Sequence, residues 1–128
     1  MIDAVITASE TAPEPALAKL VAALRDAVDR RCSDVIRATV VDSAAGLLAD
    51  LGDFPRAARL LGAGDHWRAG RPRPMPEHAH AERTATAARA ALGSVRWASE
   101  RALGAGLTAD DVLRELDEAR SSYAAEPR

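Results

Sequence analysis

The chain has 128 residues and a formal net charge of −2, with acidic and basic residues interspersed. This length suits one domain, and the balanced charge argues against a surface built to attract nucleic acid or an anionic membrane. About half of the residues are hydrophobic (48%) but only 3% are aromatic, so a core must be built from leucine, valine and alanine at close helix–helix contacts. This composition favours an all-α fold.

The first predicted helix begins at Thr11, because a hydroxyl followed three residues later by Glu14 has the spacing of a capping box. Apolar residues at helical spacing continue it towards Arg31. A second helix is expected from Ser33, which can cap it, to Gly52, which ends it. Its apolar face is predicted to hold Ile36, Val40, Ala44, Leu47, Leu48 and Leu51.

Asp53 is predicted to cap a third helix, which leaves a hinge at Gly52 and Asp53 between two amphipathic helices. Ala45 on one helix and Ala57 on the other are the small residues that allow close packing. This is the helix–turn–helix pattern of a tetratricopeptide repeat. The buried stripe of the third helix is predicted to be Ala57, Leu60, Leu61 and Ala63.

Residues 70–76 contain three alternating prolines and are predicted to form a stiff, extended connector. A fourth helix is then expected from Pro76 to Leu92. A fifth is capped by Ser94 and broken at 104–106, and a sixth is opened by a capping box at 108–111. The sequence thus predicts one helical domain over 1–128, a tetratricopeptide-like stack of five or six helices. It divides into repeat-like helices in 11–69, the connector at 70–76 and C-terminal capping helices in 77–120.

An ordered series of motifs runs over about residues 35–116: G-D-F-P-R-A-A-R-L-L-G-A, a Pro-rich link, A-E-R, A-R-A-A-L-G and G-L-T-A-D-D-V-L. The series resembles the C-terminal tetratricopeptide-like region of actinobacterial LuxR-type and antibiotic-regulatory ATPase transcriptional regulators. The resemblance implies a helical interaction or sensing module. The chain has no Gly-rich loop ending in Lys-Ser or Lys-Thr and no evident recognition helix, so the resemblance implies neither ATPase activity nor DNA binding.

Binding surfaces of helical stacks come from the concave face, here the exposed side of the helix that begins near Ser33. The candidate polar contacts on it are Arg37, Asp42 and Asp50. A second candidate is the basic patch next to Trp67, because cationic and aromatic groups together can hold a phosphate or stack a base. Neighbouring acidic residues dilute this patch, which consists of Arg68, Arg71 and Arg73.

Metal binding and catalysis have weaker support. His78 and Glu82 are four residues apart and share a helix face, and His66 can add a third ligand from across the connector. Their spacing matches no zinc-protease or finger pattern, so we expect no metal. Cys32 follows two arginines but has no base nearby in the sequence, and a lone cysteine at a helix end is usually a packing residue.

We therefore expect no catalytic residue, no cofactor and a non-enzymatic interaction or regulatory module. With no leader and no apolar run long enough to span a membrane, the expected location is the cytoplasm. Direct nucleic-acid binding is disfavoured by the net charge. The alternative is a small helical protein that binds a ligand or metal, or an enzyme, and that uses the region of Trp67, the arginines and the histidines.

The expected partner is another protein or a second copy of the chain. The first helix is predicted to bury Leu17, Leu20, Leu24 and Val28 inward, which leaves Val21 and its neighbours on a face outside which no further helix is predicted to stack. Either Ile2, Val5 and Ile6 fold back over it as a short lid, or it pairs with its copy. Two-fold pairing is the commonest way to hide a self-complementary patch, which favours a homodimer.

Overall fold

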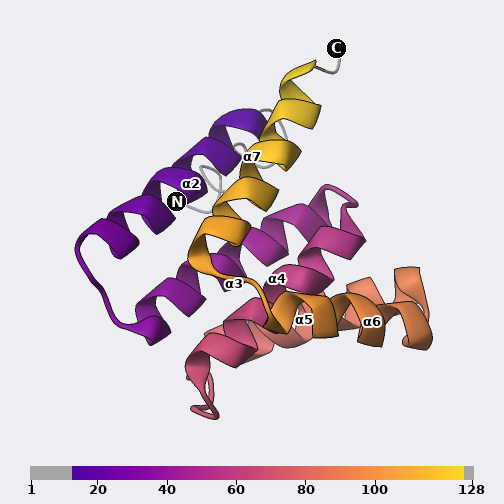
Figure 1. Ribbon diagram of the computed structural model, residues 1–128. Helices are drawn as coiled ribbons and strands as arrows, with labels where there is room; N and C mark the ends of the chain where they lie inside the picture. The colour runs from indigo at the N-terminus through magenta and orange to yellow at the C-terminus, as the bar shows by residue number, and fades with distance from the viewer. Residues whose placement is uncertain (1–12, 126–128) are drawn as a thin grey trace.

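The computed structural model describes residues 13–125, in which the chain forms six helices and no strand (Figure 1). This confirms the all-α fold of five or six helices. None of these helices has both the length and the apolar character needed to cross a membrane. Thr11 and the predicted lid at 2–6 lie outside the described residues. The helices are α2 (Pro13–Asp29), α3 (Asp34–Asp50), α4 (Phe54–Arg68), α5 (Glu77–Leu92), α6 (Ser94–Ala105) and α7 (Ala109–Ala125).

The helices are arranged in three pairs. α3 and α4 pack against each other in the middle, with α2 and α7 together at one end and α5 and α6 at the other (Figure 1). The middle pair is the predicted hairpin. Ser33 Oγ accepts from the Ile36 N–H at 3.3 Å and caps α3, and Asp53 Oδ1 accepts from the Arg56 N–H at 3.4 Å and caps α4. Gly52 has φ of 87°, a left-handed conformation that favours glycine, and it makes the turn between them.

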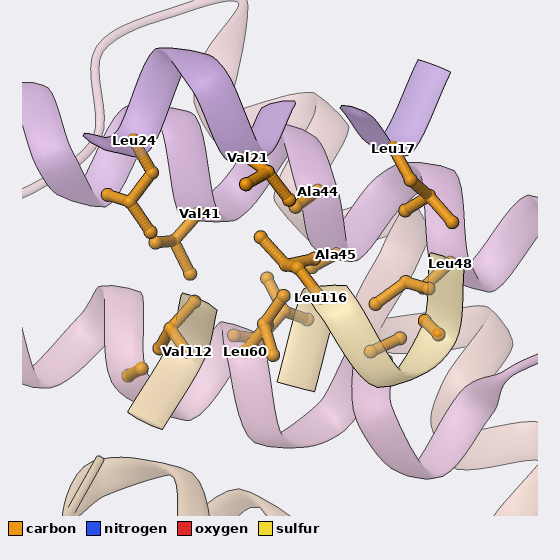
Figure 2. Close-up of a cluster of buried hydrophobic side chains, with 14 of the residues drawn as sticks. Leu17, Val21, Leu24, Val41, Ala44, Ala45, Leu48, Leu60, Val112 and Leu116 are labelled. Atoms are coloured by element: carbon orange, nitrogen blue, oxygen red, sulfur yellow. The ribbon is translucent and has the colours of Figure 1, made fainter. Parts of the chain in front are cut away.

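Small and branched side chains from α2, α3, α4 and α7, with Ala81 of α5, fill the core; Figure 2 shows most of them. Ala45 and Ala57 are both fully buried, as predicted for the close contact between α3 and α4. The predicted stripe of α4 is also buried throughout. The largest side chains that are fully buried are Leu17, Leu24, Leu48, Leu60, Leu116, Val41 and Val112.

The predicted α3 face is correct except at Ile36, but the buried side of α3 is wider than predicted. Ala44 and Leu48 are fully buried, and Val40, Leu47 and Leu51 pack partly buried against the core. Ile36 is 50% exposed, whereas Val41 is fully buried and Asp42, a predicted surface residue, is 5% exposed. The physical reason is that α2, α4 and α5 all pack against α3, so no single stripe defines its buried side. A pattern of apolar residues alone could not indicate that a carboxylate would be enclosed.

The outer face of α2 was predicted to be uncovered, and this is wrong. Val21 is 3% exposed, because α7 returns along α2 and covers it, whereas Leu24 is fully buried as predicted. Two ion pairs fasten the two helices, between Arg120 Nε and Glu14 Oε2 at 2.8 Å and between Arg25 Nη2 and Asp117 Oδ2 at 3.3 Å. A homodimer through Val21 and Leu24 would therefore require α7 to leave.

Helix α6 ends at Ala105, within the predicted break at 104–106, but Ser94 is its first helical residue rather than its cap. Near this end α6 crosses α4 closely. A Cβ at Gly104 would lie 1.8 Å from the Arg59 carbonyl oxygen, and one at Gly62 would lie 2.1 Å from the Arg101 carbonyl oxygen. Each helix thus places a glycine against the other's backbone, and this packing outweighs the low helix propensity of glycine.

The capping box that opens α7 is confirmed. The Thr108 N–H donates to Asp111 Oδ2 at 3.0 Å, and the Asp111 N–H donates to Thr108 Oγ1 at 3.1 Å. The hydrogen bond from the Thr108 backbone is the main reason that the pKa of Asp111 lies below its ordinary value of 3.8. Such a carboxylate stabilises the fold above its unfolded pKa, and the contribution disappears as the pH falls through the folded pKa.

We expect Asp111→Asn to lower stability at neutral pH, with the deficit relative to the parent shrinking as the pH falls below 3.8. Urea denaturation followed by circular dichroism at a series of pH values measures this. Asp110→Asn, at an exposed position in the same turn, is the control. A deficit that does not change with pH would contradict the role of the ionised Asp111.

Candidate functional site

A buried ion cluster joins α3, α4 and the connector. Asp42 on α3 is 5% exposed, and Arg68 at the end of α4 is 2% exposed. Arg68 Nη2 donates to Asp42 Oδ2 at 3.0 Å. Arg73 on the connector donates to both oxygens, from Nε to Oδ2 at 2.8 Å and from Nη2 to Oδ1 at 3.0 Å. Buried charges persist only with such partners, so this cluster anchors the connector to the hairpin.

The backbone of α4 approaches the cluster closely. A Cβ at Gly64 would lie 2.5 Å from Asp42 Oδ1, so the carboxylate lies where a side chain of α4 would otherwise be. The hydrogen bonds to Asp42, with a smaller contribution from Asp65, hold the pKa of Arg73 above its ordinary value despite partial burial. Arg73 therefore remains a fixed cation.

The charges continue from the connector to α6. Arg73 Nη1 lies 2.6 Å from Asp65 Oδ1 on α4, and Arg101 of α6 pairs with Asp65 Oδ2. The guanidinium carbon of Arg101 also lies 5.9 Å from the centroid of the Trp97 ring, within the range of a cation–π contact. A chain of alternating charges thus leads from the buried cluster to Trp97, which is half-buried.

Beside Arg101 is a groove of about 450 Å³ between α4 and α6, called here the Trp97 groove. Its walls carry Asp65 and His66 from α4 and Trp97 and Arg101 from α6. A cavity of about 180 Å³ adjoins it on the side of α5, shares three of these residues and adds Arg89 among others. The floor of the groove is formed by small residues, Gly62, Ala98, Ala102 and Ala105.

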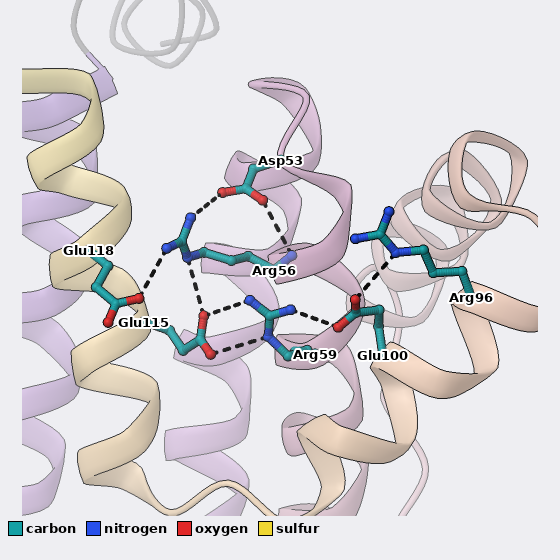
Figure 3. Close-up of polar contacts among 7 residues, drawn as sticks. All are labelled: Asp53, Arg56, Arg59, Arg96, Glu100, Glu115 and Glu118. Atoms are coloured by element: carbon teal, nitrogen blue, oxygen red, sulfur yellow. Dashed lines mark hydrogen bonds and ion pairs between the residues drawn. The ribbon is translucent and has the colours of Figure 1, made fainter. Parts of the chain in front are cut away.

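A second ion network fastens α4 to α6 and α7 (Figure 3). Glu115 of α7 accepts from Arg56 Nε at 3.2 Å and from Arg59 Nη2 at 3.0 Å. Arg59 Nη1 also donates to Glu100 of α6 at 2.7 Å, and Arg56 Nη2 donates to Glu118 at 3.1 Å. The carboxylates of this network accept hydrogen bonds from arginines that hold the helices together, which is a structural role.

The structure brings together only part of the predicted surface. Asp42, Arg68 and Arg73 meet in the buried cluster, whereas Arg37 and Asp50 on α3 do not belong to it. Asp50 is exposed, and Arg37 is half-buried with no hydrogen-bond partner for its Nε within the described part of the chain. The predicted concave-face set of Arg37, Asp42 and Asp50 is therefore not one surface.

The residues predicted for the basic patch do not lie together either, nor do those predicted for the alternative metal site. Arg71 is exposed and donates from Nε to the Arg68 carbonyl oxygen at 3.2 Å. Trp67 donates from Nε1 to the Leu107 carbonyl oxygen at 3.2 Å and packs against the core. Residues 13–125 contain no group of three His, Cys, Asp or Glu side chains placed to hold a metal ion. Of the three proposed ligands His66, His78 and Glu82, the first lines the Trp97 groove and the others are exposed on α5.

Asp65 and Arg101 were not predicted to belong to a site. They are 36 positions apart, so no local pattern links them. The available signal was the spacing of Trp97 and Arg101, which are four apart on a helix and share a face. Cys32 is half-buried at the turn after α2 and takes part in neither ion network.

Comparison of the chain with protein-family models, with curated proteins and with solved structures finds no match.

Proposed function

We propose that the chain is a non-enzymatic helical interaction module that docks an acidic amphipathic helix of another protein on the outer side of α6. The observation that carries this proposal is an exposed, mainly apolar stripe, the outer α6 face, made of Val95, Ser99, Ala102 and Leu103. Val95 is 86% exposed and Leu103 is 61% exposed. Ser99 lies four residues from both Val95 and Leu103, and Ala102 lies beside Leu103, so the stripe follows one side of the helix, where a partner helix can pack.

The charges around this face define the partner. Glu100 of α6 points inward to Arg59 and its side chain is 13% exposed, whereas Arg96 is 60% and Arg101 46% exposed. The accessible charge on α6 is therefore positive. A helix with an apolar stripe flanked by Asp or Glu complements it, and complementary charge favours both encounter and orientation.

A second copy of the chain fits this face less well. The acidic helix α7 buries its apolar side chains, among them Val112 and Leu116, against the core. It cannot offer an apolar stripe without unfolding from α2. The partner is therefore proposed to be a different protein. The resemblance to the C-terminal region of transcriptional regulators supports a cytoplasmic, regulatory setting for this contact.

The test uses a labelled synthetic helical peptide with leucines at i, i+3, i+4 and i+7 and glutamates beside them, and a matched peptide with lysines in place of the glutamates. Fluorescence anisotropy should show saturable binding of the acidic peptide. We expect the Val95→Glu, Leu103→Glu double variant to bind at least about tenfold more weakly, which corresponds to about 1.4 kcal/mol.

The control is Ile36→Glu, which changes an exposed apolar residue on α3 in the same way. It should bind like the parent. Equal binding of the lysine peptide, or equal loss in the control, would contradict the proposal. Light scattering provides a further check, because a dimer of the parent that Leu103→Glu abolishes would assign the outer α6 face to a second copy instead.

A further inference from the structure

We infer that the Trp97 groove binds a small planar molecule that carries an anionic group, either a carboxylate or a phosphate. This site adjoins the outer α6 face, with which it shares Ala102, but it lies between α4 and α6 and does not depend on the docking of a helix. The inference rests on the shape of the groove, on Trp97 in its wall and on the Arg101 guanidinium, which has N–H donors beyond those bonded to Asp65.

The groove has room for a ring. Its volume is about 450 Å³, within the range of small-molecule sites. The floor consists of Gly62 and of alanines on α6, which form a low surface because none carries more than a methyl group. Trp97 is half-buried and lines the groove, where its indole ring can contact a planar ligand. A planar ligand can therefore lie on the alanines against the tryptophan.

Arg101 supplies the anion contact. The single hydrogen bond that it makes within residues 13–125 is from Nη2 to Asp65. Its Nε and Nη1 donors remain, and the side chain is 46% exposed in the wall of the groove. A guanidinium is a planar fork that matches carboxylate and phosphate oxygens, so Arg101 can accept a ligand anion without losing Asp65.

The charge balance favours an anion. The connected cluster contains two carboxylates, Asp42 and Asp65, and three guanidiniums, Arg68, Arg73 and Arg101. It therefore carries one excess positive charge, and part of that charge is buried. A monoanionic ligand at Arg101 neutralises this excess.

The adjoining cavity leaves this preference unchanged. Arg89 of α5 lines it and is exposed, with no ion pair in the described part of the chain. Glu82 lines the same cavity and balances this charge, so the excess remains centred on Arg101. A larger ligand can reach Arg89 past Trp97, whereas a smaller one uses Arg101 alone.

The experiment follows the two indole N–H signals by ¹H–¹⁵N NMR during titration of the whole chain. The probes are benzoate with its neutral match benzamide, and adenosine monophosphate with its neutral match adenosine. We expect the Trp97 signal to shift saturably with at least one of the two anions. Trp67 serves as an internal control because its N–H is bonded to the Leu107 carbonyl oxygen outside the groove. The anion that binds more tightly distinguishes a carboxylate ligand from a phosphate ligand.

Arg101→Gln should weaken binding at least about tenfold, because a charge-assisted hydrogen bond is lost. Arg101→Lys keeps the positive charge but loses the planar guanidinium, so its affinity for the anion should lie between that of the parent and that of Arg101→Gln. Arg114 of α7 has an exposed side chain and does not line the groove, so the Arg114→Gln variant should bind like the parent. The inference is overturned if the anions cause no saturable shift at millimolar concentration, if the neutral probes bind equally well, or if Arg101→Gln binds like the parent while remaining folded by circular dichroism.

Discussion

Replacing Asp42 by alanine is expected to lower the free energy of unfolding by about 3–5 kcal/mol, because it leaves buried arginines without their counter-charge. Arg68 is 2% exposed and, among the carboxylates of residues 13–125, pairs with Asp42 alone, so water cannot replace the lost partner. Arg73 retains Asp65, which makes the orphaned charge on Arg68 the main cost. For a domain of this size such a loss is a large share of the total stability.

Guanidinium denaturation followed by circular dichroism measures this loss. Asp50→Ala removes the same group from the exposed end of the same helix and should change stability by no more than about 0.5 kcal/mol. If Asp42→Ala does not fold, Asp42→Asn keeps the volume and allows a measurement. Similar midpoints for the Asp42 and Asp50 variants would mean that the cluster contributes little.

A double variant tests the mechanism of the loss. Changing Asp42 to leucine and Arg68 to methionine replaces the pair with apolar side chains of similar size. We expect this double variant to be more stable than Asp42→Ala, since no unpaired charge is left on α4. Equal destabilisation would indicate that packing volume, and not charge, is what Asp42 supplies.

Gly104→Ala is expected to destabilise the fold by about 1–3 kcal/mol, although the same change in an open helix would stabilise it. The added Cβ would lie 1.8 Å from the Arg59 carbonyl oxygen, so α4 and α6 must separate. The sign of the effect is the diagnostic quantity. Propensity alone predicts a gain of about 0.5–1 kcal/mol.

The control is Gly106→Ala, because a Cβ there meets its nearest atom at 3.7 Å, an ordinary contact. Thermal and denaturant unfolding should show little change in that variant. Gly62→Ala should behave like Gly104→Ala, and the two together should cost less than their sum, since either one already separates the helices. A stabilised Gly104→Ala variant would refute the close crossing.

The parts of the fold that were predicted correctly depend on neighbours in sequence. Ser33 and Asp53 accept hydrogen bonds from amides three residues ahead, so their roles follow from local spacing. The stripe through Leu60 and Leu61 follows from helical period. These features are determined by a few consecutive residues and need no knowledge of the tertiary arrangement.

The parts that were not predicted depend on distant partners. Asp42 was placed on the surface because its cation comes from the connector, 31 positions further along. The cover on α2 comes from α7, and the Arg120 and Glu14 pair that fastens it spans 106 positions. Spacing within one helix says nothing about such contacts, and the Trp97 groove arises in the same way from α4 and α6.

The pairing of α2 with α7 has a consequence for synthesis. On the ribosome α2 emerges before every other described helix, and α7 emerges after them. Until then the side of α2 that bears Val21 has no permanent cover, and exposed apolar surface of this kind invites aggregation. The nascent chain therefore depends on α7 to cover this apolar face of α2. Translation that stalls before Ala109 leaves a helical product in which α7 does not cover the face, so the product is prone to aggregate.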